Sequence, residues 1–114
     1  MHYVTFNGVK KNITHINELY EIENPENVKI LNLTSNNLTE LDKDIFSNFT
    51  QLQELDLSYN NLTELDKDIF SNLTQLNNLN LRNNNLIELN KDIFLNLTQL
   101  QKLRLWSNNL IKKI

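Results

Sequence analysis

The sequence predicts an α/β fold in the form of a curved right-handed solenoid. A parallel sheet should line its concave face, and short helical turns should lie on its convex side. First, one 24-residue pattern recurs almost four times, starting at residues 28, 52, 76 and 100. Second, each copy contains a two-residue alternation of leucines, which suits a short strand with one buried face. Third, a single unit of this length cannot bury its apolar face alone, so the copies must stack.

The repeated unit follows the pattern L-x-x-L-x-L-x-x-N-x-L-x-x-L-x-x-x-x-F-x-x-L, which residues 52–75 show in full. Its strand is centred on Leu55 and Leu57. Parallel strands need a long return connection, and the rest of the unit supplies it. We expect residues 65–73 to form a short helical turn on the outer side, with Asp66 capping its start.

Two further columns of the repeat predict structural ladders. One asparagine closes each strand, and its buried amide must find hydrogen-bond partners in its own turn and in the neighbouring turn. One phenylalanine per unit should stack under the convex side. The asparagines are Asn36, Asn60, Asn84 and Asn108, and the phenylalanines are Phe46, Phe70 and Phe94.

This pattern resembles the leucine-rich repeat family in its 24-residue, Phe-containing form. The resemblance covers residues 28–114, with Val28 and Phe49 in two of the Leu positions. The family usually has proline where this chain has Asp42, Asp66 and Asn90, and a capping residue fits there too. The resemblance implies a non-enzymatic module that binds another protein on its concave strand face.

The sequence divides into a capping segment, residues 1–27, and the repeats 28–51, 52–75, 76–99 and a shortened copy, 100–114. The capping segment has two interpretations. Asn7-Gly8 suits the tight turn of a hairpin followed by a helix. Alternatively, residues 12–16 resemble residues 37–41 and indicate a worn first repeat, meaning a degenerate copy of the pattern, with an outer helix at 18–23. We favour the worn repeat.

The last copy ends without a phenylalanine or an outer turn, and Lys113 stands in a Leu position. An uncovered sheet edge invites association. The sequence therefore also predicts possible homo-oligomers formed through Leu110, Ile111 and Ile114, which would make the chain a self-assembling structural protein.

The second and third copies differ mainly at the outward positions of the strand and its trailing turn. The expected partner-binding residues on the concave face change from acidic in one copy to basic in later ones, and they include aromatic and arginine side chains that often dominate interfaces. They are Glu54, Asp56, Ser58, Tyr59, Asn78, Asn80, Arg82, Asn83, Lys102, Arg104 and Trp106.

Composition narrows the function further. The net charge is −3 in 114 residues, there is no cysteine, and Asn and Leu together exceed a third of the chain. We expect no catalytic residues, no cofactor, no metal, and neither nucleic-acid nor membrane partners, because no suitable motif or apolar span is present. Without cysteines or an N-terminal apolar leader, we expect a cytoplasmic protein. A surface recognition or adhesion module is a second alternative, which would require export.

Overall fold

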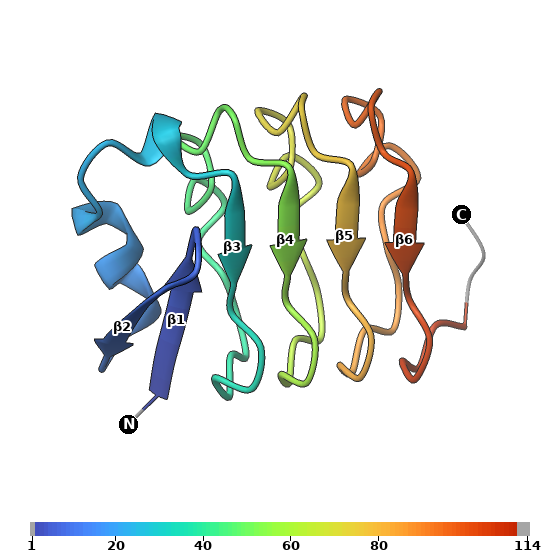
Figure 1. The fold of residues 1–114 in the computed structure, drawn as a ribbon. Coiled ribbons are helices and arrows are strands. Elements are labelled where there is room, and N and C mark those ends of the chain that lie inside the picture. The colour runs from blue at the N-terminus through green and yellow to red at the C-terminus, as the bar shows by residue number, and fades with distance from the viewer. Residues whose placement is uncertain (1, 112–114) are drawn as a thin grey trace.

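The computed structural model describes residues 2–111. Its strands form one sheet in the spatial order β2-β1-β3-β4-β5-β6 (Figure 1). They are β1 (His2–Phe6), β2 (Val9–Ile13), β3 (Ile30–Asn32), β4 (Glu54–Asp56), β5 (Asn78–Asn80) and β6 (Lys102–Arg104). Strands β3 to β6 are parallel, and Leu31, Leu55, Leu79 and Leu103 lie side by side in them. The predicted solenoid is therefore confirmed, with one turn for each 24 residues.

The capping segment is a hairpin, so the interpretation as a worn first repeat is wrong. Strands β1 and β2 are antiparallel, and β1 also runs antiparallel to β3. Asn7 and Gly8 both have positive φ, 50° and 81°, as a tight turn that matches strand twist requires. Two 3₁₀ helices, η1 (Ile16–Glu21) and η2 (Pro25–Asn27), lead from the hairpin into the first repeat.

The outer side of each repeat is built from successive hydrogen-bonded turns rather than from a helix. The amide of Ile69 donates to the carbonyl of Asp66, and that of Leu73 donates to the carbonyl of Phe70. The Asp66 side chain accepts from the amide of Asp68 at 2.8 Å, as a capping residue does. Residues 2–111 contain no α-helix. A segment this short can form only a few helical hydrogen bonds, and these do not offset the cost of ordering its residues. The segment therefore stays as separate turns.

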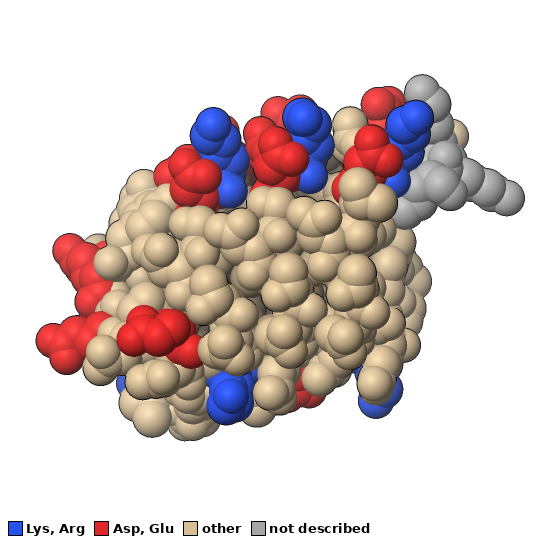
Figure 2. Space-filling model, turned by 90° about the horizontal axis from the view of Figure 1, so that it is seen from above, with Lys and Arg blue, Asp and Glu red and all other residues tan. Residues whose placement is uncertain are grey.

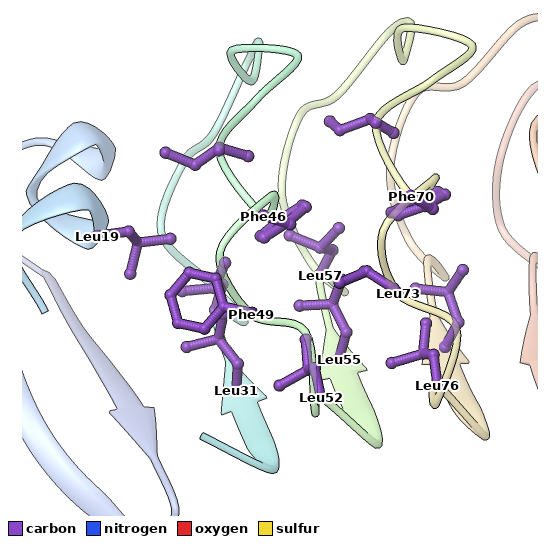
Figure 3. Packing of buried hydrophobic residues seen from close by; sticks show 14 of the residues in the cluster. Leu19, Leu31, Phe46, Phe49, Leu52, Leu55, Leu57, Phe70, Leu73 and Leu76 are labelled. Carbon is purple, nitrogen blue, oxygen red and sulfur yellow. The ribbon is translucent and has the colours of Figure 1, made fainter. Parts of the chain in front are cut away.

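A single apolar core runs along the stack (Figure 3). Leucines from the strands and the outer turns fill it, and Val4, Ile13 and Leu19 extend it into the cap. The phenylalanines form a column in which the Phe70 ring lies 6.4 Å from that of Phe46 and 6.3 Å from that of Phe94. Continuous burial from cap to last turn explains why the repeats form a single folded unit.

A column of buried asparagines holds the turns in register. The Nδ2 group of Asn60 donates to the carbonyls of Leu33, Leu57 and Ser58 at 3.0–3.1 Å. Its Oδ1 atom accepts from the amides of Asn36 and Leu38 at 2.9 and 3.0 Å. Asn84 and Asn108 make corresponding bonds one and two turns further on. They donate to carbonyls of their own turn and of the turn before it, and they accept from Leu62 and Leu86.

The cap joins this column at one end. The carbonyl of Tyr3 in β1 accepts from Asn36 Nδ2 at 3.1 Å, where a preceding repeat would otherwise supply the carbonyl. Asn36 Oδ1, in contrast, is buried without a hydrogen-bond partner. Asn7 secures the hairpin, because its side chain accepts from the amide of Lys29 at 2.7 Å and donates to the carbonyl of Asn27. The hairpin thus replaces a repeat only in part.

Candidate protein-binding face

The outward residues of β3 to β6, together with the turn that follows each strand, form one continuous surface. We call this surface the strand face. In β3, β4 and β5 the central leucine is buried in the core and its neighbours lie on the other face, as alternation requires. In β6 the equivalent Leu103 is 36% exposed. The position before that leucine carries Ile30, Glu54, Asn78 and Lys102, side by side across the sheet. Side chains from four separate copies therefore meet on one surface.

Two of the expected partner-binding residues are buried, which corrects their prediction as contact residues. Ser58 is 1% exposed and Asn80 is 8% exposed. Asn80 Oδ1 accepts from the amide of Arg82 at 3.1 Å, and Asp56 Oδ1 accepts from the amide and the hydroxyl of Ser58. These side chains shape the turn after each strand, so they offer little surface to a partner.

A polar chain crosses the middle of the strand face. Asn78 Nδ2 donates to Glu54 Oε1 at 3.3 Å, and Arg104 Nη1 donates to Asn78 Oδ1 at 3.4 Å. The asparagine thus links an acidic side chain of β4 with a basic side chain of β6. A shallow hollow of about 170 Å³ lies here, and Ile30 and Asn32 extend its lining to β3.

An aromatic and cationic cluster lies in the turns after β4, β5 and β6. The guanidinium carbon of Arg82 is 5.2 Å from the ring centre of Tyr59 and 5.8 Å from that of Trp106. The two rings are 51% and 53% exposed, although both are large. Arg82 therefore lies between two aromatic side chains that come from the neighbouring repeats on either side. We call these three residues the aromatic–arginine cluster.

The backbone that carries this cluster is unusual for its residue types. Ser35, Tyr59, Asn83 and Ser107 occupy the same position of the repeat, and all have φ between 55° and 58°. Non-glycine residues adopt this left-handed conformation uncommonly. Hydrogen bonds between successive turns hold it, since the amide of Tyr59 donates to the carbonyl of Arg82 and that of Asn83 donates to the carbonyl of Trp106. Asn83 itself is half-buried.

Charges on the strand face are not neutralised by ion pairs. Within residues 2–111 the one ion pair joins Lys67 and Asp68 at 3.7 Å, in an outer turn. Arg82, Lys102 and Arg104 therefore have no carboxylate within ion-pair distance in the described chain. The outer turns differ, because Figure 2 shows basic and acidic side chains side by side there in successive groups.

The last described turn exposes apolar surface. Phe94, Leu100, Leu105 and Leu110 are half-buried, whereas the equivalent Phe70, Leu76, Leu81 and Leu86 are fully buried. Ile111 is 82% exposed. Ile114, the third residue expected to take part in self-association, lies outside the described residues.

A hollow of about 540 Å³ lies between η1 and residues 36–42 of the first repeat. His15, which lines this hollow, caps the start of η1 together with the neighbouring Glu18. His15 Nδ1 accepts from the amide of Asn17, and the Glu18 carboxylate accepts from the amides of Thr14 and His15. These backbone hydrogen bonds lower the pKa of Glu18.

Nearby, the hydroxyl of Tyr20 donates to the Asp42 carboxylate at 2.5 Å, and this bond raises the pKa of Tyr20 to about 12. No group of three or more histidine, aspartate or glutamate side chains in residues 2–111 is placed to hold a metal ion. The described residues also contain no helix that is long and apolar enough to cross a membrane.

Comparison with models of protein families shows to which family the chain belongs. The leucine rich repeat model matches residues 26–86 and again residues 51–111. The chain therefore belongs to the leucine-rich repeat family. Domains of this family are generally non-enzymatic and commonly mediate protein–protein interactions. A comparison with curated protein sequences gives no significant match.

Solved structures give the same assignment. A chain in the Toll–Spätzle complex of Drosophila is 34% identical over 70% of this chain, with a TM-score of 0.67. Human 5T4, a trophoblast glycoprotein, is 32% identical over 74% of this chain, with a TM-score of 0.57. The leucine-rich repeat domain of APL1B is 25% identical over 90% of this chain, with a TM-score of 0.55. The chain spans only 10%, 30% and 37% of those chains, respectively.

Proposed function

We propose that this chain is a protein-binding module that uses its strand face. The observation that carries the proposal is the aromatic–arginine cluster, Tyr59, Arg82 and Trp106. Tryptophan, tyrosine and arginine are the residue types that most often dominate binding energy. Here two large rings stay about half exposed on a surface that carries mainly polar and charged side chains besides Ile30. A partner that covers them would remove apolar area from water and gain affinity.

The contrast between the two sides of the solenoid supports the same choice. The outer turns repeat one charge pattern, with Lys43, Lys67 and Lys91 at equivalent positions among acidic residues. The strand face varies from copy to copy, for example with Ile30, Glu54, Asn78 and Lys102 at one equivalent position. Its cations have no acidic neighbours within ion-pair distance. A surface with one distinct arrangement of side chains can select one partner, whereas a uniform row offers several equivalent registers. The similarity to a chain in the Toll–Spätzle complex is in keeping with a protein partner.

The proposal can be tested with peptides selected from a random library displayed on phage. The selected peptides would be measured against a strand-face variant, Glu54→Lys with Lys102→Glu, and against an outer-side control, Glu64→Lys with Lys91→Glu. Both variants keep the net charge, and all four positions lie at least partly in solvent. We expect the strand-face variant to lose binding and the control to keep it. Loss only in the control would place binding on the outer side and refute the proposal.

A second candidate function is self-assembly, and the exposed apolar end of the last described turn favours it. Ile111 and Leu103 are large apolar residues that remain in solvent there. We place this function second because of charge. Suppose that β6 paired antiparallel with β6 of a second copy, with the two Leu103 residues opposite each other. Lys102 of each copy would then lie directly opposite Arg104 of the other, and like charges in that arrangement are destabilising.

Light-scattering chromatography over a range of concentrations distinguishes the two candidates. A dimer that forms more readily at high salt and disappears on Ile111→Asp would move assembly to first place, because salt screens the opposed cations. A monomer at every concentration leaves the strand face as the functional surface.

A further inference from the structure

The aromatic–arginine cluster defines more than a contact area, because its geometry restricts what Arg82 can bind. Tyr59 comes from the turn after β4, and Trp106 comes from the turn after β6, while Arg82 follows the strand between them. The two rings thus come from the repeats on either side of Arg82, and both lie within cation–π distance of its guanidinium. Such stacking is favourable for a planar cation and limits its rotation. A ligand can then reach the charge mainly through the edge of the guanidinium plane.

The hydrogen-bonding capacity of this guanidinium is not used within the described chain. Arg82 Nε is buried and has no partner. The terminal nitrogens make no hydrogen bond to any described residue, and they are not buried. No carboxylate lies within ion-pair distance. The structure therefore holds a fixed cation whose in-plane donors still await an acceptor, which is unusual for a partly buried charge.

We infer that the aromatic–arginine cluster is a recognition pocket for a carboxylate, supplied by an aspartate or glutamate side chain of the bound protein. The inference rests on the proposed function and names the chemistry of its central contact. The guanidinium edge matches a carboxylate through two parallel N–H···O bonds. Once a partner covers the cluster, the rings and the partner together would shield this pair from water, and a shielded ion pair is stronger than an exposed one.

Charges beside the cluster favour an acidic residue over a neutral or basic one. Lys102 and Arg104 lie on β6, next to the strand that leads to Arg82, and neither has a carboxylate partner among the described residues. The resulting positive potential would attract an acidic segment and speed its association. On β4, the other neighbour of β5, Glu54 and Asp56 would repel the same segment. A partner segment should therefore cross the strands with its acidic residue over β5 and β6.

Phage-displayed peptides with unrestricted residues at every position provide the probe. If the inference is right, peptides that bind the strand face will share an aspartate or glutamate at one position. Replacing that residue by its amide should weaken binding at least about tenfold. Arg82→Gln should weaken the acidic peptide by a similar factor and leave the amide peptide almost unchanged, so the two losses will not add. Lys67→Gln, on the outer side, is the matched control and should have no effect.

The rings require a separate readout because they position the arginine. Trp106 is the single tryptophan of the chain, so its fluorescence reports directly on the cluster. We expect the acidic peptide to change this fluorescence and the amide peptide to do so only at higher concentration. Trp106→Phe should retain most of the preference for the acidic peptide over its amide, and Trp106→Ala should lose most of it. Circular dichroism of each variant establishes that the fold is kept.

The outcomes separate this inference from the function on which it rests. Peptides that lose binding on Glu54→Lys with Lys102→Glu, yet show no acidic position and tolerate Arg82→Gln, would overturn the carboxylate pocket and leave the proposed function standing. Peptides that bind only to the outer side would overturn both.

Discussion

Replacement of Asn60 by alanine gives the most informative test of how the stack is held together. The Asn60 side chain is 5% exposed and bonds to its own turn and to the preceding repeat. Its Oδ1 atom accepts from the amides of Asn36 and Leu38 in the preceding repeat. Its Nδ2 group donates to the carbonyls of Leu33 and Leu57. Alanine removes all of these bonds at once and leaves the strands otherwise unchanged.

The expected cost follows from the groups that lose their partners. Two buried amide donors are left without an acceptor, and each unsatisfied buried donor costs about 1–3 kcal/mol. The carbonyls cost less, because a carbonyl has two lone pairs and tolerates partial pairing. Some water can enter the space that alanine leaves. We therefore expect the free energy of unfolding to fall by about 2–4 kcal/mol, and Tm to fall by roughly 10–20 °C.

Urea unfolding followed by Trp106 fluorescence and by circular dichroism measures this change. The matched control is Asn61→Ala, since Asn61 is the next residue and its side chain is exposed. The control should change stability by less than about 0.5 kcal/mol. Asn36→Ala should cost less than Asn60→Ala, because Asn36 Oδ1 has no partner to lose. Equal effects at Asn60 and Asn61 would refute the asparagine column as the element that holds the register.

Three further predictions concern other parts of the fold. Phe70→Ala should lower the free energy of unfolding by about 3–5 kcal/mol in urea titrations, because the ring is fully buried between two other rings. Gly8→Ala should destabilise the hairpin by about 1 kcal/mol in the same assay, since φ is +81° there although a Cβ would meet no atom. The pKa of Tyr20 is raised to about 12. Its hydrogen bond to Asp42 should therefore stabilise the fold below pH ~10, and this stabilisation should be lost as pH rises toward 12. In urea unfolding measured at several pH values, Tyr20→Phe should not show this loss.

The repeat made most of the fold predictable from sequence. Leucine alternation at Leu55 and Leu57 fixes which side of each strand is buried, and the 24-residue period fixes the neighbours of each strand. The capping segment has no such repetition. The likeness between residues 12–16 and 37–41 suggested a worn repeat, but the local preference of Asn7-Gly8 for a tight turn decided the structure.

The candidate site was less predictable, because alternation applies only within the extended strand. After Asp56 the chain bends, and Tyr59 adopts a left-handed backbone. Beyond this point, alternation along the sequence no longer tells which side chains are buried and which are exposed. For this reason the sequence predicts Ser58 on the surface, although it is buried. The stacking of Arg82 with Tyr59 and Trp106 joins residues 23 and 24 positions apart, and it follows from the register of the turns.

The central claim is that the strand face is the surface that receives a partner. The most direct measurement is the NMR footprint of a selected peptide on the backbone amides of the isotope-labelled chain. We predict that the backbone amides whose signals shift will cluster in residues 54–59, 78–83 and 102–107. The side-chain N–H signals of Arg82 and Trp106 should shift as well. Shifts confined to the outer turns, residues 42–50, 66–74 and 90–98, would contradict it.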